Sequence, residues 1–85
     1  MALEIQRGMV VKSKAGHDKN EYFVIAKKLD DEDRFVMIMN GKSRKIESPK
    51  KKNMRHLSIV NKILPEDSLT SDKSIRKALA PFYKD

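Results

Sequence analysis

The chain has 85 residues and a formal net charge of +7, with 39% hydrophobic residues, 36% charged residues and no cysteine. This length predicts one domain with a modest core, which leaves little room for a large active-site cleft, and the lack of cysteine excludes disulfides and cysteine-based zinc or redox sites. The excess positive charge favours a polyanionic partner, nucleic acid above all, over a charge that serves only solubility.

Short apolar segments separated by turn signals predict a mainly β fold. The first strand is expected in Met9–Ala15 and the second in Tyr22–Ala26, with a polar, lysine-bearing loop between them. The acidic run at residues 30–33 is expected to form the next turn. A compact apolar strand then follows over Arg34–Met39.

The dipeptide Asn40-Gly41 comes directly after this third strand. Asn-Gly is the strongest short-range signal for a two-residue hairpin, because both central residues of a type I′ turn need a positive φ. We therefore expect Phe35–Met39 to pair with a fourth strand at Lys42–Ile46. Glu47–Asn53 holds Pro49 and three lysines and is expected to be a loop, and a fifth strand is expected at Arg55–Asn61.

Five antiparallel strands within about 60 residues predict a small, strongly bent barrel, because closing the sheet protects its edges. An open meander sheet capped by the C-terminal segment is the alternative. The boundaries expected on this basis are a barrel over residues 1–64 and a C-terminal tail over residues 65–85.

The tail is expected to contain one short helix, Asp72–Ala80. Ile75, Leu79 and Phe82 follow helical spacing, residues 70–72 offer N-cap side chains, and Pro81 should end the helix. A helix this short is not stable alone in water, so it must pack on the barrel or on a partner, or else fray.

Positive charge concentrates in two parts of the chain, the first hairpin loop and the segment from residue 42 to residue 56. Cations that neutralise phosphates release condensed counterions, which gives affinity that falls with salt. Because the aromatic residues are few and Phe23 and Phe35 are expected in the core, we expect recognition of nucleic-acid backbone and shape. The residues expected to bind nucleic acid are Lys12, Lys14, Gly16, His17, Lys19, Lys42, Arg44, Lys45, Lys50, Lys51, Lys52 and Arg55.

Strand topology places the first hairpin loop and the turn after the third strand at one end of the barrel. The acidic turn and the loop over Glu47–Asn53 should begin from the other end. Curvature of the barrel would then be needed to bring Lys50–Lys52 near Lys12 and Arg44.

The segment Gly8–Ile25 resembles the KOW motif, a strand, a glycine-containing loop and a second strand found in ribosomal proteins and transcription elongation factors. Gly16 matches the loop glycine, Lys19 matches the loop lysine, and Asn20 stands where the motif usually has a second glycine. Glycine supplies a positive φ for the tight turn and lets the backbone approach a phosphate, and asparagine is the best substitute in that conformation.

A longer series of matches is similar to the small bacterial KOW-domain RNA-binding proteins, which are related to a KOW-bearing large-subunit ribosomal protein of archaea and eukaryotes. The matches run from Gly8 to Leu79: Ser13-Lys14-Ala15-Gly16-x-Asp18-Lys19, Asn40-Gly41-Lys42-x-Arg44-Lys45, Pro49-Lys50-Lys51-Lys52, His56-Leu57 and Ile75-Arg76-Lys77-Ala78-Leu79. The resemblance implies an SH3-like barrel that binds ribosomal RNA on or near the large subunit. It also implies that residues 15–20 and Pro49–Lys52 make the RNA contacts.

The residue pattern does not favour a metal site or a catalytic site. His17 and His56 are the two histidines, and neither has the spacing of a metal site. No nucleophile elbow, phosphate-binding glycine loop or spaced carboxylate pair occurs, so we expect no catalysis, no metal and no cofactor.

The rival hypothesis is a protein-interaction module of the same SH3-like fold that binds a peptide or a protein of the ribosome or the transcription complex. Exposed aromatic clusters, which such peptide sites need, are scarce in this sequence. The N-terminal residues lack the apolar run of a signal peptide, and no stretch reaches the roughly 20 apolar residues of a membrane span. We therefore expect a cytoplasmic monomer that does not bind membranes.

Overall fold

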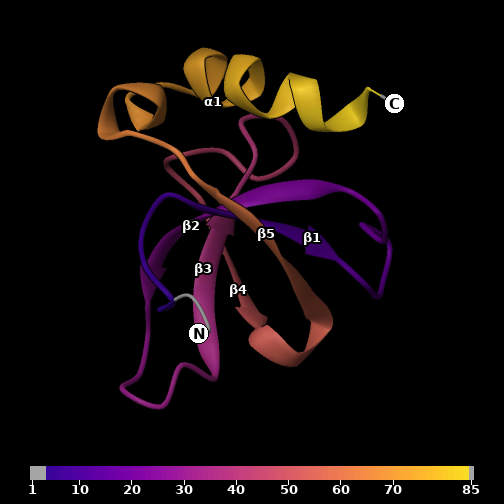
Figure 1. Cartoon of the computed structure of the whole chain (residues 1–85), viewed down its shortest axis with the longest axis vertical. Helices are drawn as coiled ribbons and strands as arrows, with labels where there is room; N and C mark the ends of the chain where they lie inside the picture. Colours follow the sequence, from indigo (N-terminus) through magenta and orange to yellow (C-terminus); the bar gives the residue numbers. More distant parts are fainter. Residues whose placement is uncertain (1–3, 85) are drawn as a thin grey trace.

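Five strands form one antiparallel sheet in the order β4-β3-β2-β1-β5, and a short helix lies across it (Figure 1). The computed structural model describes residues 4–84. The strands are β1 (Met9–Ser13), β2 (Tyr22–Lys28), β3 (Phe35–Met39), β4 (Lys50–Asn53) and β5 (Leu57–Ile63). The helix is α1 (Asp72–Leu79), and three 3₁₀ helices complete the fold: η1 (Met54–His56), η2 (Glu66–Leu69) and η3 (Ala80–Tyr83).

The predictions of a mainly β fold, five strands and a short C-terminal helix are confirmed. The strand order ends at β4 on one side and at β5 on the other, so the bent sheet does not close into a complete barrel. The first hairpin is also confirmed, with Val10 of β1 paired to Val24 of β2.

Both faces of the sheet carry a hydrophobic core, which explains why β1 and β2 read as continuous apolar runs rather than alternating ones. One cluster, on what we call the first face, contains Ile5, Met9, Val11, Phe23, Ile25, Val36, Ile38 and Leu57. The other, on the helix-covered face, contains Val10, Val24, Ala26, Met39 and Leu64 together with Leu69, Ile75 and Leu79 from the C-terminal segment.

The C-terminal helix begins and ends almost where the sequence predicts. Ser71 is the N-cap and forms a capping box with Ser74, and α1 ends at Leu79, one residue before the predicted end. Pro81 lies in the first turn of η3, which continues the chain in a tighter helix. Ile75 and Leu79 are fully or almost fully buried against the sheet, which supplies the stability that a two-turn helix lacks by itself.

The predicted position of the fourth strand is wrong. Lys42–Ile46 is not a strand, and β4 is formed by Lys50–Asn53, a segment that was expected to be a loop. Ile38 pairs with Lys50 and Phe35 pairs with Asn53 across the β3–β4 ladder. A ten-residue connection, residues 40–49, therefore replaces the expected two-residue turn.

Asn40 and Gly41 explain why the hairpin does not form. Asn40 is buried and lacks the positive φ of a type I′ turn, and its Oδ1 instead accepts hydrogen bonds from the backbone N–H groups of Lys42 and Arg44, each at 2.9 Å. Gly41 has a φ of 77° and lies against the carbonyl oxygen of Asp72 in α1. Contact with the helix thus selects a wide loop over a tight turn.

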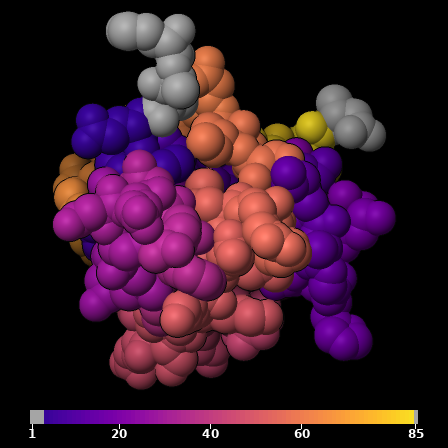
Figure 2. All heavy atoms as spheres, turned by 90° about the horizontal axis from the view of Figure 1, so that it is seen from below, coloured from indigo at the N-terminus to yellow at the C-terminus, as the bar shows by residue number. Residues whose placement is uncertain are grey.

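The fifth strand begins two residues later than predicted and ends at Ile63. Residues 54–56 form η1, which turns the chain between β4 and β5, and the Asn53 side chain accepts a hydrogen bond from the backbone N–H of Arg55. In the view from below, the segment that includes η1 and the start of β5 lies between the acidic turn near residue 30 and the first hairpin loop near residue 18 (Figure 2). The acidic turn therefore lies apart from the lysine-bearing loop.

Candidate nucleic-acid interface

The first hairpin loop has a defined backbone conformation. Gly16 has a φ of 85° and Asn20 a φ of 74°, so both adopt the left-handed conformation that the resemblance assigns to these positions. The N–H of Asn20 donates to the Ser13 carbonyl at 2.8 Å, and the N–H of Lys19 donates to the Gly16 carbonyl at 3.2 Å. These hydrogen bonds hold the lysine-bearing loop in one arrangement at the end of β1 and β2.

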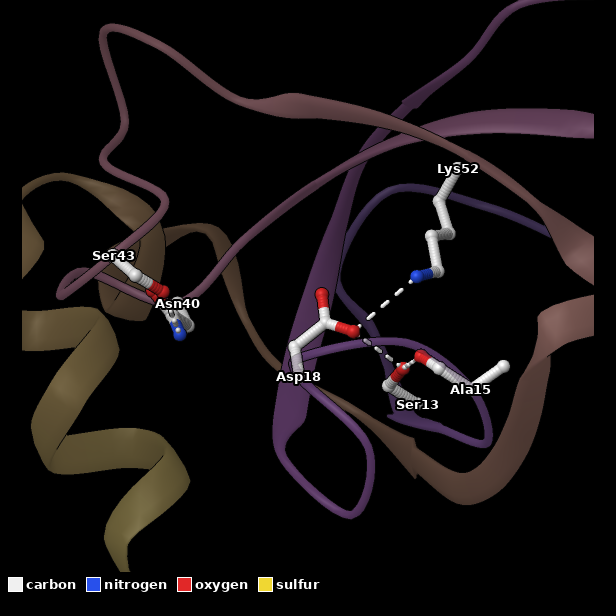
Figure 3. Close-up of polar contacts among 6 residues, drawn as sticks. All are labelled: Ser13, Ala15, Asp18, Asn40, Ser43 and Lys52. Carbon is white, nitrogen blue, oxygen red and sulfur yellow. Dashed lines mark hydrogen bonds and ion pairs between the residues drawn. The ribbon is translucent and has the colours of Figure 1, made fainter.

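Asp18 joins this loop to the edge strand β4 (Figure 3). Its Oδ1 lies 2.9 Å from the Ser13 hydroxyl and 3.3 Å from Lys52 Nζ, and the Asp18 and Lys52 side chains are only 12% and 11% exposed. Burial by itself raises the pKa of Asp18, but the hydrogen bonds from Ser13 and Lys52 and the charges of Lys52 and Lys50 outweigh it, so the pKa is lowered. The carboxylate therefore stays charged and holds the Lys52 ammonium.

The three consecutive lysines point to two different faces, because successive side chains of a strand alternate. Lys50 and Lys52 lie opposite Ile38 and Val36, on the first face of the sheet. Lys51 lies on the other face, with its Nζ 4.7 Å from the centre of the Phe35 ring. The expectation that Lys50–Lys52 lie in a loop is wrong, because these lysines lie in strand β4.

A hollow of about 300 Å³ lies between the first hairpin loop, the residue 40–49 connection and β4. We call it the hairpin groove, and its lining residues are Gly16, His17, Asp18, Glu21, Ser43, Arg44, Lys50 and Lys52. Five of the twelve expected RNA-binding residues line it. The groove also holds the carboxylates of Asp18 and Glu21. Asp18 is paired with Lys52, which leaves Arg44 and Lys50 as the remaining cations and Glu21 as the remaining carboxylate.

The Asn40 side chain positions Arg44 at the groove. The N–H of Arg44 donates to Asn40 Oδ1, and the N–H of Asn40 donates back to the Arg44 carbonyl at 2.8 Å. This pair of bonds closes the loop that carries Lys42, Ser43 and Arg44 beside the first hairpin. The expected placement of these two loops at the same end of the sheet is therefore confirmed.

The other expected residues lie outside the groove. Lys14, Lys19 and Lys45 are exposed, and Lys12 lies with its Nζ 5.4 Å from the centre of the Tyr22 ring. Arg55 is exposed in η1, next to His56, whose carbonyl accepts a hydrogen bond from the Lys14 N–H at 2.8 Å. Lys42 lines a second hollow beside α1.

Asp18 is the residue whose role was not expected from the sequence. A count of charges in the sequence indicates only that Asp18 offsets the positive charge of the loop lysines. In the structure, Asp18 forms an ion pair with Lys52 and holds its side chain in place. Its sequence signal is the pattern Ser13–Gly16–Asp18, in which a turn glycine brings a carboxylate back to the serine hydroxyl. Its second oxygen, Oδ2, is buried and accepts no hydrogen bond from the part of the chain that is described.

Within residues 4–84, no group of three or more histidine, cysteine, aspartate or glutamate side chains is placed to hold a metal ion. No helix over the same residues is long and apolar enough to cross a membrane. The expectations that the protein is not an enzyme and uses no cofactor stay predictions.

No known family model matches the chain, and no curated protein matches its sequence. The resemblance to KOW-domain proteins therefore depends on the residues quoted above and stays a prediction.

Proposed function

We propose that the protein binds structured RNA, namely ribosomal RNA of the large subunit, through the hairpin groove and the exposed lysines around it, without catalysing a reaction. The observation that supports this proposal is the convergence of Arg44 and Lys50 with the Gly16–His17 turn, although some 25 to 35 residues separate these segments in the sequence. Cations on a fixed scaffold bind phosphates with little loss of conformational entropy.

The arrangement suits a phosphate-bearing ligand for two reasons. Arg44 offers a planar guanidinium that can form paired hydrogen bonds with a phosphate, and Lys50 adds a compact charge beside it. Gly16 has no side chain and is exposed, so a phosphate can approach the loop backbone closely. The exposed Lys14 and Lys19 on the same loop extend the positive surface beyond the groove.

The test uses a charge reversal within the groove and a matched one outside it. Arg44→Glu combined with Lys50→Glu should weaken binding to large-subunit ribosomal RNA and lower the slope of log affinity against log salt by about 2, since each phosphate contact contributes about 0.9 in duplex nucleic acid. Lys51→Glu combined with Lys77→Glu reverses two exposed charges outside the groove and should weaken binding far less. Lys52 is left intact because it pairs with Asp18.

Two results would contradict the proposal. One is binding that does not change with salt, and the other is an equal loss for the variant with Lys51 and Lys77 reversed and the groove variant. Retained association with ribosomal particles after the groove reversal would instead favour the protein-interaction hypothesis.

A further inference from the structure

A second hollow, of about 320 Å³, lies on the other side of the residue 40–44 loop. We call it the helix hollow, and its lining residues are Asn40, Lys42, Arg76, Leu79, Ala80 and Tyr83. Its volume is at the lower end of the range of small-ligand sites. Apolar side chains from α1 and η3 form much of the wall, two cations lie beside them, and none of the six lining residues is acidic.

Tyr83 presents an aromatic ring to this hollow in a fixed position. Its hydroxyl accepts a hydrogen bond from the Tyr22 N–H at 2.8 Å, and its ring is nearly perpendicular to the Tyr22 ring, at an interplanar angle of 82° with the centroids 5.1 Å apart. The residue nevertheless remains 53% exposed. An aromatic ring that is held by its hydroxyl and by a perpendicular neighbouring ring, but is still half exposed to solvent, is suited to stacking with a planar group.

Arg76 is fixed by the loop that separates the two hollows. Its Nη1 donates to the Gly41 carbonyl at 2.6 Å, and a guanidinium has five N–H donors, so this bond leaves further donors for a ligand. Lys42 follows Gly41 in the chain and is exposed. The two cations therefore border an apolar and aromatic hollow.

The two hollows lie on either side of one short segment. Asn40 and Lys42 line the helix hollow, whereas Ser43 and Arg44 line the hairpin groove. Figure 3 shows Asn40 and Ser43 beside the helix and Asp18 across from them in the first hairpin loop. A polyanion that runs over Arg44 and Lys42 would therefore pass from one hollow to the other.

We propose that the helix hollow binds one unpaired nucleobase of the RNA, stacked on Tyr83 and flanked by Lys42 and Arg76. This inference rests on the proposed RNA binding and specifies its ligand, namely RNA with an unstacked nucleotide next to a structured region. Base stacking on aromatic side chains is how proteins read single-stranded loops and bulges. An acidic peptide is disfavoured because the hollow adjoins the groove proposed to bind RNA phosphates.

The experiment compares two RNA hairpins that differ by a single bulged nucleotide. The chain has no tryptophan, so Tyr83→Trp provides a specific fluorescence probe. Titration with the bulged hairpin should quench this fluorescence, whereas the fully paired hairpin should leave it nearly unchanged. Tyr83→Ala should weaken binding to the bulged hairpin about tenfold, the typical value for one lost stacking contact, and leave the paired hairpin unaffected.

Matched variants separate stacking from a structural role of Tyr83. Tyr83→Phe keeps the ring, loses the hydrogen bond from Tyr22 and should retain the preference for the bulged hairpin. Ala80→Leu fills the hollow while Tyr83 stays in place, and should remove the preference even if Tyr83→Ala does not fold. Lys42→Ala should weaken binding to the bulged hairpin more than Lys77→Ala, which removes an exposed cation elsewhere on α1.

The outcomes distinguish this inference from the proposed function. If both hairpins bind in a salt-dependent way but Tyr83→Ala affects them equally or not at all, the base site is wrong and the RNA proposal stands. If the wild-type protein binds neither hairpin and no ribosomal RNA, both are wrong. If an acidic, aromatic peptide quenches the fluorescence of the Tyr83→Trp variant and RNA does not, the inference is overturned in favour of a peptide site.

Discussion

Lys52 reaches from the edge strand β4 to Asp18 in the first hairpin loop, with its Nζ 3.3 Å from Oδ1. Both side chains are nearly buried, and Ser13 contacts the same carboxylate oxygen at 2.9 Å. Because β4 lies at one end of the strand order and β1 near the other, this ion pair connects distant parts of a sheet that does not close. It also forms one wall of the hairpin groove.

Lys52→Met should destabilise the fold by about 3 kcal/mol, because removing one member of a buried ion pair leaves the other charge without compensation. Lys51→Met removes an exposed charge and should cost less than about 1 kcal/mol. Urea unfolding at neutral pH measures both values. Combining Lys52→Met with Asp18→Asn should recover part of the loss, and strictly additive effects would show that the two side chains do not interact.

The contacts of the Asp18 carboxylate should make the free energy of unfolding depend on pH in the acidic range. The pKa of Asp18 is lowered in the folded protein relative to its ordinary value of 3.8, so its contribution is fully present above that value and disappears as the pH falls through the lower, folded pKa. The difference in unfolding free energy between the wild type and Asp18→Asn should therefore shrink below about pH 4. Urea titrations from pH 7 to pH 3 measure this difference, and a difference that is constant throughout would refute the linkage.

Gly41→Ala should destabilise the protein far more than Gly16→Ala. Both glycines have a positive φ, so both variants incur a conformational strain of about 1 kcal/mol. At Gly41 the new β-carbon would also collide with the backbone carbonyl of Asp72, whereas at Gly16 its nearest neighbour lies 3.6 Å away. Thermal unfolding of the two variants compares them directly, and equal melting temperatures would contradict the close contact of the loop with α1.

Ile75→Ala should destabilise the fold by about 3 kcal/mol, since Ile75 is fully buried between α1 and the sheet. Lys77→Ala, two residues later on the exposed side of the helix, should change the stability by less than about 0.5 kcal/mol. Chemical denaturation reports both. Near-equal effects would mean that the helix does not pack on the sheet in solution.

Local sequence patterns are sufficient to predict the elements whose formation depends on local interactions. The hairpin between β1 and β2 follows from two apolar runs around a glycine turn, and α1 follows from helical spacing, the Ser71 cap and Pro81. The convergence of Arg44 and Lys50 with the Gly16 turn is not predictable from these signals, because they place the fourth strand at Lys42–Ile46. Asn-Gly predicts a tight turn only where nothing else binds the asparagine side chain or covers the glycine.

The sequence by itself determined the class of the protein: a small, basic, mainly β domain with a short amphipathic helix, as its apolar periodicity, turn residues and charge require. The tertiary structure decided which lysines share a surface. It placed Lys50 and Lys52 on one face and Lys51 on the other, and it brought Tyr83 beside Lys42. The physical reason is that side-chain alternation and helix docking depend on strand register and on contacts between residues far apart in the chain, and local propensity carries no information on either.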